Sequence, residues 1–590
     1  MHIAPIFRGP GITNPLNHVL YWGEKMSELG NKGIRIGARK PLGLALMAIF
    51  AVAGQAHAEG AHTHHVHAAV TGGEAQMVGQ PAATQVMNLD IVLPVRDRDG
   101  LKALAAAVSD PQSPLFHHYL SPSEFTERFG PTQADYATVV SYMEERGLKV
   151  TGGTRDGMEV QVSGSVDKVE RAFHVTMRNY KHPTENRVFF SPDREPTTDM
   201  AVKLWHVSGM DNFSIPHAKY VKRSDYAAAH GISEEAVVSH ATTGSGPSGS
   251  FTGSDMRAAY YGSGSLTGAG QHVALFEYYG TDLADLTTYY KNIGQTNKVP
   301  VTLISVDGTS TSCTAKNKCD DGEQELDITQ ALGMAPGLAG LEMYVGSTDT
   351  AIISAMTTHS PLALAIGCSW GWTPADASTL DPYFEKMAVQ GQSFFVASGD
   401  NSTWTKSGAA EAWPGDDAHI ISVGGTDLVT ASAGGAWKSE TAWADSGGGI
   451  SPDKIAIPAW QQISGVITST NKGSTTLRNG PDVAANANFT FYTCDNQTTC
   501  KANTYGGTSF AAPMWAGLVA LANQQAASTG KSAVGFFNPK IYAQNVTSSY
   551  STGFHDVTSG TSGSYKAGTN FDLVTGWGSP KAAVIDQLLK

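Results

Sequence analysis

After residue 270 the chain alternates short apolar runs with helix-like segments, and this alternation constrains its fold more than any other feature. Strands that are apolar along their whole length have both faces buried, so helices must cover the sheet on both sides. The pattern predicts an α/β domain on a parallel, doubly wound sheet, with any site at the carboxyl ends of its strands. The strand candidates are residues 271–278, 341–346, 361–370, 393–400 and 420–426.

A hydroxyl stands at the start of the most apolar helix candidate. Ser509 ends the segment GGTS and precedes residues 510–521, which are apolar nearly all round. A serine before a helix is ordinarily an N-cap. The amino end of a buried helix also stabilises developing negative charge, which favours a nucleophile there. This segment alone leaves both interpretations open.

A serine nucleophile of the subtilisin type needs a histidine base, and the chain offers none in a suitable context. No histidine after residue 250 is followed by Gly-Thr or Gly-His. His230 does precede a glycine, but it lies in a polar, linker-like stretch. If Ser509 is catalytic, we therefore expect a base other than histidine. The histidines after residue 250 are His272, His359, His419 and His555.

Three acids are candidates for that role. Glu323 and Asp327 are four residues apart on a predicted helix, so they share one face. They are either helix-start acids that favour the dipole or paired carboxylates that hold a general base near its working pH. Asp400 ends a strand candidate, where an acid either caps an exposed turn or faces a site at the sheet edge.

Composition and cysteine spacing limit the class of protein. The chain has 590 residues, 41% of them hydrophobic, which predicts two domains, and its net charge of -13 disfavours a nucleic-acid partner. Cys313 and Cys319 bracket five residues, as do Cys494 and Cys500, so we expect two local disulfides in an oxidising compartment. Cys368, in an apolar run, is expected to be a buried free thiol.

The chain divides into five predicted parts. Residues 1–58 resemble a secretory signal peptide, with Met26 as an alternative start and a membrane anchor as the alternative interpretation. Residues 59–80 are rich in His, Ala and Gly and are predicted to be a disordered linker. Residues 81–220 form a compact α+β domain without a cluster of catalytic residue types, and 221–250 a polar linker. Residues 251–590 form the α/β domain, and the protein is expected to be secreted, with no stable membrane anchor.

Four motifs occur in an order that resembles the sedolisin family, the serine-carboxyl peptidases. They are DGEQELDITQALGMAPG at 321–337, SWG at 369–371, ASGD at 397–400 and GGTSFAAP at 506–513. The first domain is similar to the pro-kumamolisin-type activation propeptide. The resemblance covers residues 84–590 and implies a subtilisin-like catalytic domain preceded by an α+β, ferredoxin-like propeptide. Supporting segments lie at 422–426, 446–451, 458–461 and 481–487.

The resemblance also implies roles for individual residues. Ser509 would be the nucleophile and Glu323 its general base, while Asp327 would orient Glu323 and tune its pKa. Asp400 would stand in the oxyanion hole, where its carboxyl must be protonated to donate a hydrogen bond. The outer members of the hydrogen-bond network, for which packing is the alternative role, would be Glu277 and Trp370.

A calcium ion is the cofactor implied by the resemblance of residues 555–580. The carboxylates of Asp556 and Asp572 would bind it together with backbone carbonyls, which matches the preference of calcium for oxygen ligands. Asn570 stands where the family usually has glycine, and a metal-free turn is the alternative. The carbonyl ligands would come from Val557, Gly568 and Asn570.

The function that follows is a secreted, acid-active endopeptidase made as a self-processing zymogen. Its partners would be protein or peptide substrates and its own propeptide as intramolecular inhibitor, with the enzyme a monomer. Self-cleavage is expected within residues 215–250. The alternatives are a His-dependent subtilisin-like protease and a catalytically silent binding protein on the same fold.

Overall fold

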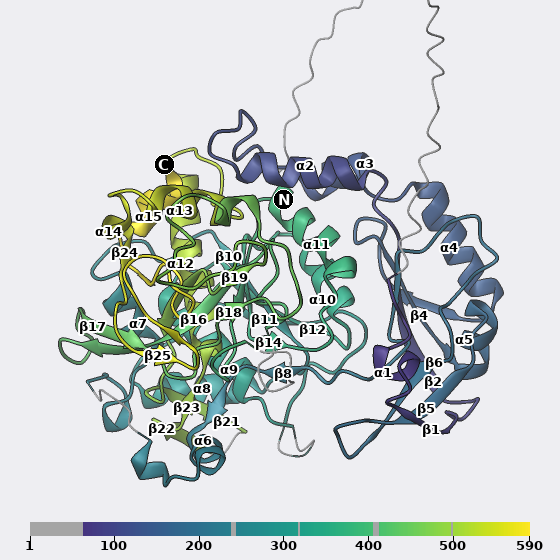
Figure 1. Ribbon diagram of the computed structural model, residues 1–590, viewed down its shortest axis with the longest axis horizontal. Helices are drawn as coiled ribbons and strands as arrows, with labels where there is room; N and C mark the ends of the chain where they lie inside the picture. Colours follow the sequence, from purple (N-terminus) through teal and green to yellow (C-terminus); the bar gives the residue numbers. More distant parts are fainter. Residues whose placement is uncertain (1–62, 238–242, 315, 317–318, 405–411, 497–498) are drawn as a thin grey trace, which may run out of the picture. The chain divides into compact units, whose positions relative to one another are not determined.

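The computed structural model describes residues 63–237, 243–314, 316, 319–404, 412–496 and 499–590 (Figure 1). The predicted signal peptide, residues 1–58, lies outside the described residues.

The peptidase domain is built on a sheet of order β11-β12-β10-β13-β15-β16-β17, and β20 also pairs with β16. All pairings are parallel except that of β17 with β16. The predicted parallel, doubly wound sheet is thus confirmed. The strands are β10 (His272–Glu277), β11 (Val301–Ser305), β12 (Gly340–Val345), β13 (Ala365–Cys368), β15 (Ser393–Ala397), β16 (Ile421–Thr430), β17 (Trp437–Ala442) and β20 (Val483–Asn486).

Three of these strands were not predicted from the sequence. β11 is an edge strand that alternates between half-buried and exposed residues, and β17 is largely polar. β20 is only four residues long. β11 and β17 lack the continuous apolar run of the central strands because an edge or face of each is open, whereas β20 is fully buried but too short to show such a run.

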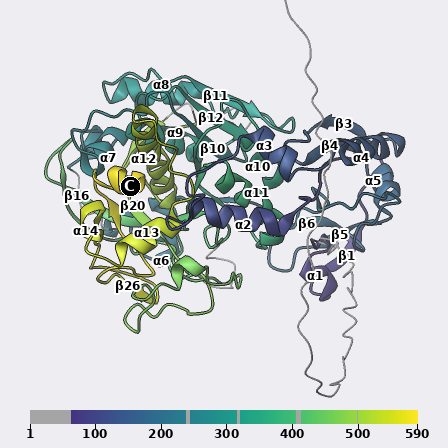
Figure 2. The ribbon, with the colours of Figure 1, turned by 90° about the horizontal axis from the view of Figure 1, so that it is seen from above.

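Helices cover both faces of this sheet. The helices are α7 (Gly253–Tyr260), α8 (Leu283–Asn292), α9 (Gly322–Met334), α10 (Asp349–Met356), α11 (Ala377–Val389) and α12 (Thr508–Ser528). Figure 2 shows α9 and α12 on one side of β10 and β12, and α10 and α11 on the other. α12 is buried without interruption from Thr508 to Asn523, as its apolar sequence predicts.

The domain before it has a four-stranded antiparallel sheet of order β3-β4-β2-β7. Numbered along this sheet, the order is 2-3-1-4, which is the ferredoxin-like arrangement predicted. A second sheet joins β1, β5 and β6. The elements are β2 (Val86–Val92), α2 (Arg98–Ser109), α3 (Pro122–Arg128), α4 (Gln133–Glu145), β3 (Lys149–Gly152), β4 (Glu159–Ser165), α5 (Val166–Phe173), β5 (Met177–Lys181), β6 (Val188–Pro192) and β7 (His206–Ser208).

The disorder predicted for residues 59–80 is wrong over residues 63–80, which the structure describes. These residues include helix α1 (Ala68–Thr71) and strand β1 (Gln76–Gly79), which pairs with β5. The backbone N–H groups of His65 and Val66 donate to the Glu195 carboxylate at 3.0–3.2 Å. Composition suggested a solvated tail because a partner more than 120 residues away in sequence cannot be read from the segment itself.

The predicted linker, residues 221–250, is also more structured than expected. Strand β9 (Val221–Lys222) leads directly into helix α6 (Arg223–His230). The Arg223 guanidinium donates to the carbonyls of Glu234 and Val237, which folds the following turn back on the helix. The structure describes 243–250 as an irregular segment with a short turn, and residues 238–242 lie outside the described part.

The cysteine predictions are confirmed. Cys313 is bonded to Cys319, and Cys494 to Cys500. Cys368, the last residue of β13, is a fully buried free thiol. Among the described residues, no helix combines the length and the apolar character needed to cross a membrane.

Candidate active site

Ser509 lies at the buried amino end of α12, and its side chain does not cap the helix. Gly507, with φ +144°, is the N-cap residue. A φ in that region favours glycine, which lets the chain turn sharply into the helix. The Ser509 hydroxyl instead donates to Glu323 Oε2 at 2.9 Å. The capping interpretation is therefore wrong, and the hydroxyl faces a carboxyl group.

Helix α9 brings three carboxyl groups together behind this hydroxyl. Glu323 and Asp327 lie one turn apart on α9, and the charges of Asp327 and of Glu277, at the end of β10, both act on Glu323. The outer end of this chain is held by Trp370 Nε1, which donates to Glu277 Oε2 at 2.9 Å. The structure thus places the predicted base, its neighbour and both predicted network residues in one continuous set of contacts with Ser509.

Burial sets the protonation of these groups. It raises the pKa of Glu323 well above its usual range, and the charges of Asp327 and Glu277 raise it further. Burial also raises the pKa of Asp327 to about 8, against the opposing effect of the Ser369 hydroxyl, which donates to it at 2.7 Å. Carboxyl groups this close disfavour each other's ionisation, so the set shares protons, and a member that does ionise is a strong proton acceptor.

Asp400 follows β15 and lies on the other side of the amino end of α12. Its Oδ1 accepts the Thr508 N–H at 2.7 Å and the Thr508 hydroxyl at 2.9 Å. Its Oδ2 is buried and has no hydrogen-bond partner. Burial raises the pKa of Asp400 to about 8. A protonated Oδ2 would be a donor aimed into the site.

The space between these groups is filled by the chain's own residues 217–222. The Ser509 N–H donates to the Lys219 carbonyl oxygen at 3.0 Å, and the Ser509 hydroxyl contacts the same oxygen. A Cβ built on Gly507 would lie 2.6 Å from that oxygen and 2.8 Å from Asp400 Oδ2. The Lys219 carbonyl therefore sits beside the nucleophile, where an oxyanion would form.

The histidines lie elsewhere. His272 pairs with Glu342 at 2.6 Å, and the His555 ring stacks on Trp437. His419 lies 3.4 Å from the Asp417 carboxylate. No histidine in the described ranges hydrogen-bonds Ser509, and this disfavours the His-dependent alternative.

The predicted calcium loop has oxygen atoms suited to a hard cation. Asp572 Oδ1 accepts the N–H groups of Val574 and Thr575 at 2.9 and 2.8 Å, which orients the carboxylate. The Asn570 N–H donates to Asp556, and Asn570 adopts a φ of 65°, which asparagine tolerates where the family has glycine. Among the residues that the structure describes, three nearby backbone carbonyl oxygens accept no hydrogen bond. These oxygens belong to Val557, Gly568 and Asn570.

Two residues that hold the site were missed from the sequence. Ser369 anchors Asp327, and Gln324 Nε2 donates to Glu277 at 3.1 Å. Ser369 and Gln324 both lie inside the motifs given above. Their residue types and positions in the sequence, however, do not show which acid each of them contacts. Lys219 lay in the predicted propeptide, and nothing in its sequence context placed it at Ser509.

A subtilisin-like sheet, with a serine at a buried helix start facing a carboxyl group, defines a class of serine hydrolase with an acidic partner. Comparison with known proteins agrees. Residues 74–213 match the Pro-kumamolisin, activation domain model, and residues 292–578 match the Subtilase family model. Kumamolisin from Bacillus sp. (strain MN-32) is 31% identical over 537 residues, covering 85% of this chain and 91% of that protein.

More distant relatives extend the same comparison. Sedolisin from Pseudomonas sp. (strain 101) is 27% identical over 552 residues, covering 86% of this chain and 88% of its own. Tripeptidyl-peptidase 1 from Mus musculus is 23% identical, covering 85% and 91%. The structure of Pseudomonas sedolisin complexed with two molecules of pseudo-iodotyrostatin aligns with a TM-score of 0.47 and 28% identity, over 57% of this chain and 96% of that one.

The chain belongs to the sedolisin family. It is a serine-carboxyl peptidase made with an activation propeptide, and peptides are its substrates.

Proposed function

We propose that this protein is a secreted endopeptidase that works at acidic pH through Ser509, Glu323, Asp327 and Asp400. The observation that carries the proposal is the position of the Lys219 carbonyl. It accepts the Ser509 N–H while the Ser509 hydroxyl donates to Glu323. A peptide carbonyl, a nucleophile and a base are thus in contact within one buried site.

The chemical steps follow from this arrangement. Glu323 accepts the Ser509 proton as Oγ bonds to the carbonyl carbon, and the carbonyl oxygen becomes an oxyanion. The Ser509 N–H and a protonated Asp400 donate to that oxyanion. Glu323 then gives its proton to the leaving amine, and the C–N bond breaks to leave an acyl-enzyme. Water, deprotonated by Glu323, releases the acid product and restores Ser509.

Acidic working conditions follow from the two roles. Asp400 acts only while it holds a proton, so activity falls as the pH rises through the pKa of that carboxyl. Glu323 acts only while it can accept a proton, and burial together with the charges of Asp327 and Glu277 raises its pKa, which makes the carboxylate a stronger proton acceptor. Residues on both sides of Lys219 continue through the site, which supports cleavage inside a chain rather than only at its end.

Calcium would serve the fold and not the chemistry. The carboxylates of Asp556 and Asp572, with the carbonyls of Val557, Gly568 and Asn570, would hold the ion in the carboxyl-terminal loop. Bound there, calcium would neutralise two partly buried carboxylates and tie the two ends of the loop together.

Secretion and self-processing complete the proposal. Two disulfides suit an oxidising compartment. All four proposed catalytic residues come from one chain, which supports a monomeric enzyme. The propeptide continues into the site through residues 217–222, which supports its role as an intramolecular inhibitor that is cut within residues 215–250.

A pH series on the purified zymogen tests the function. At about pH 4, where carboxyl groups titrate, we expect the zymogen to convert to a shorter form and then to hydrolyse a casein substrate, with little activity above neutral pH. The Ser509→Ala zymogen should remain intact under the same conditions. Conversion of pure Ser509→Ala, or an activity maximum above neutral pH, would overturn the proposal.

A further inference from the structure

We propose that this peptidase selects lysine on the amino side of the bond it cuts, and that Lys219–Tyr220 is the first bond it hydrolyses. The inference rests on the proposed function and adds its substrate class. Its evidence is the chain's own segment 217–222, which lies across the site as a substrate would.

The segment is paired with the enzyme on both sides of Ser509. Strand β8 (His217–Ala218) pairs antiparallel with β14 (Trp370–Gly371), and β9 pairs antiparallel with β23 (Tyr505–Gly506). Lys219 and Tyr220 lie between the two pairings. The Lys219 N–H donates to the Ser369 carbonyl at 2.8 Å, so this residue is held at its nitrogen by Ser369 and at its carbonyl oxygen by Ser509.

The Lys219 side chain fills a pocket that suits an ammonium group. Lys219 is only 5% exposed, and its Nζ donates to the Ala397 carbonyl at 2.9 Å and reaches the Trp413 carbonyl at 3.5 Å. Gly371 forms the wall, where a Cβ would lie 2.4 Å from Lys219 Cε. Fixed carbonyl acceptors at the end of a narrow pocket favour a long side chain that ends in a donor.

Two carboxyl groups supply the opposite charge. Asp416 is fully buried, and its Oδ2 accepts the Ser451 hydroxyl at 2.6 Å while its Oδ1 has no partner. Burial and the charge of Asp416 raise the pKa of Asp453 to about 7, and the positive charge of Lys219 opposes that rise. The positive charge of Lys219 lowers the pKa of both carboxyl groups, so an ammonium group in the pocket favours their negative forms.

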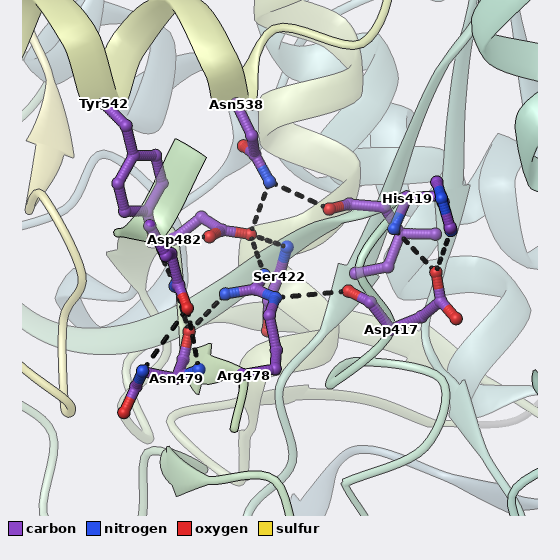
Figure 3. Close-up of polar contacts among 10 residues, drawn as sticks. Asp417, His419, Ser422, Arg478, Asn479, Asp482, Asn538 and Tyr542 are labelled. Carbon is purple, nitrogen blue, oxygen red and sulfur yellow. Dashed lines mark hydrogen bonds and ion pairs between the residues drawn. The ribbon is translucent and has the colours of Figure 1, made fainter. Parts of the chain in front are cut away.

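The nearby Arg478 already has a carboxylate partner of its own. Arg478 and Asp482 are both fully buried and form an ion pair at 2.6 Å. Figure 3 shows the Arg478 side chain directed toward Asp482 and the main chain of Asp417. The positive charge of Arg478 also acts on Asp416, but Arg478 is bonded to Asp482, so Lys219 is the cation whose side chain fills the pocket itself.

A peptide panel tests the preference directly. Mature enzyme would be assayed on internally quenched peptides that differ only before the cleaved bond, with lysine, norleucine, arginine, alanine or glutamate there. We expect kcat/KM for lysine to exceed that for norleucine, which lacks only the ammonium group, by about tenfold or more. Equal or faster cleavage of norleucine would overturn the inference. Cleavage of no peptide would instead count against the proposed function.

Variants of the pocket locate the cause. Asp416→Asn keeps the shape and removes the charge, so the lysine-to-norleucine ratio should fall by about tenfold. Gly371→Ala narrows the pocket, so the preference should move from lysine toward alanine. Asp586→Asn removes an exposed carboxylate on α15 (Val584–Leu589) and is the matched control, with the ratio expected to stay as in the unchanged enzyme. Unchanged ratios in both pocket variants would refute the assigned pocket.

The zymogen supplies an independent test that needs no added peptide. After a shift to about pH 4, amino-terminal sequencing of the first product should give Tyr220. Lys219→Met, which keeps the length and removes the charge, should slow this first cleavage by about tenfold or more, whereas Lys222→Met should not. A first cut elsewhere, with a rate that Lys219→Met leaves unchanged, would exclude Lys219–Tyr220 as the processing bond.

Discussion

At the scale of single residues, the chemistry depends on which atom faces Ser509. The hydroxyl meets a carboxyl oxygen at 2.9 Å, and the remaining carboxyl groups lie behind it in a buried row. Burial is the largest cause of the raised pKa of each of them. A carboxyl group that would lose its proton in water at weakly acidic pH can therefore hold that proton in the buried site.

Replacing the base is the most direct residue test. Glu323→Gln keeps the shape of the side chain but cannot accept the Ser509 proton, so kcat/KM should fall by about a hundredfold or more. Single replacements of His272 and His359 with alanine serve as controls and should leave turnover largely intact. If a histidine replacement abolished turnover while Glu323→Gln retained it, the carboxylate mechanism would fail.

Asp400 is tested by charge and by pH. Asp400→Ala removes one donor to the oxyanion and should lower kcat by about a hundredfold. In the unchanged enzyme, activity should decline as the pH rises through the pKa of Asp400, since only the protonated form donates. The residual activity of Asp400→Ala should lose that alkaline limb, and steady-state rates from about pH 3 to 10 would show it. If the activity of Asp400→Ala still declines at high pH as in the unchanged enzyme, a group other than Asp400 causes that decline.

At the scale of elements, two helices and one loop decide the arrangement. α9 carries Glu323 and Asp327 on one face and packs against α12, which carries Ser509. The carboxyl-terminal loop is separate from this contact and holds the proposed calcium ligands. Changes in the loop should therefore alter stability before they alter chemistry.

Chelation tests the loop. A ligand that binds only the folded state raises its stability by mass action, so a calcium chelator should lower the melting temperature of the Ser509→Ala zymogen. Asp572→Ala should lower the melting temperature and remove the sensitivity to chelator. Asp586→Asn is the control and should keep the sensitivity to chelator. A melting temperature that ignores chelator in the unchanged loop would argue against calcium.

At the scale of the whole molecule, the propeptide contacts the peptidase through more than the segment in the site. The Leu120 N–H donates to the Val389 carbonyl at 2.8 Å, and the Ser354 hydroxyl donates to Gly157 at 3.1 Å. Arg98 on α2 forms an ion pair with Glu385 on α11, whose side chain is fully buried. Both side chains of this ion pair carry a charge, and the Glu385 side chain is shielded from water.

Removing the propeptide side of that ion pair should destabilise the zymogen. Arg98→Met leaves the buried Glu385 with only His419 Nε2, at 3.6 Å, as an ion-pair partner, so the free energy of unfolding of Ser509→Ala should fall by about 1–3 kcal/mol. Arg194→Met breaks an exposed pair with Asp193 and should cost little. Thermal melts would compare the two. Equal effects would show that burial of Glu385 adds nothing to the interface.

The buried carboxyl groups also make stability depend on pH. The pKa values of Asp327 and Asp400 are raised to about 8 in the folded chain, so the folded state binds more protons than the unfolded state above about pH 4. Their stabilising contribution is complete below about pH 4 and is lost as the pH rises through about 8.

Melting curves of the Ser509→Ala zymogen measure this linkage without self-cleavage. We expect a higher melting temperature at about pH 5 than at about pH 8. Asp327→Asn in the same background removes one of the titrating groups, so the difference between the two pH values should shrink. A difference of the same size in both proteins would place the linkage outside the site.

Much of this organisation was predictable from the sequence because it depends on local pattern. The apolar strands, the buried helix after Ser509 and the two short disulfide loops all rest on residues close together in the chain. The same holds for the motif segments, whose order indicated the family. Where one face or edge of a strand is open, as in β11 and β17, the pattern weakened and the prediction missed it.

Tertiary structure decided the contacts between distant segments. Residues 63–80 fold because Glu195 and β5 supply partners, and the Asp400 and Glu323 carboxyl groups meet at Ser509 because the sheet and α9 bring them there. Above all, only the folded chain places Lys219 at Ser509 with its side chain in an acidic pocket. The sequence by itself determined which elements form and which residue types are available. The site and its selectivity were decided by packing, because hydrogen bonds and desolvation depend on distance in space and not on distance along the chain.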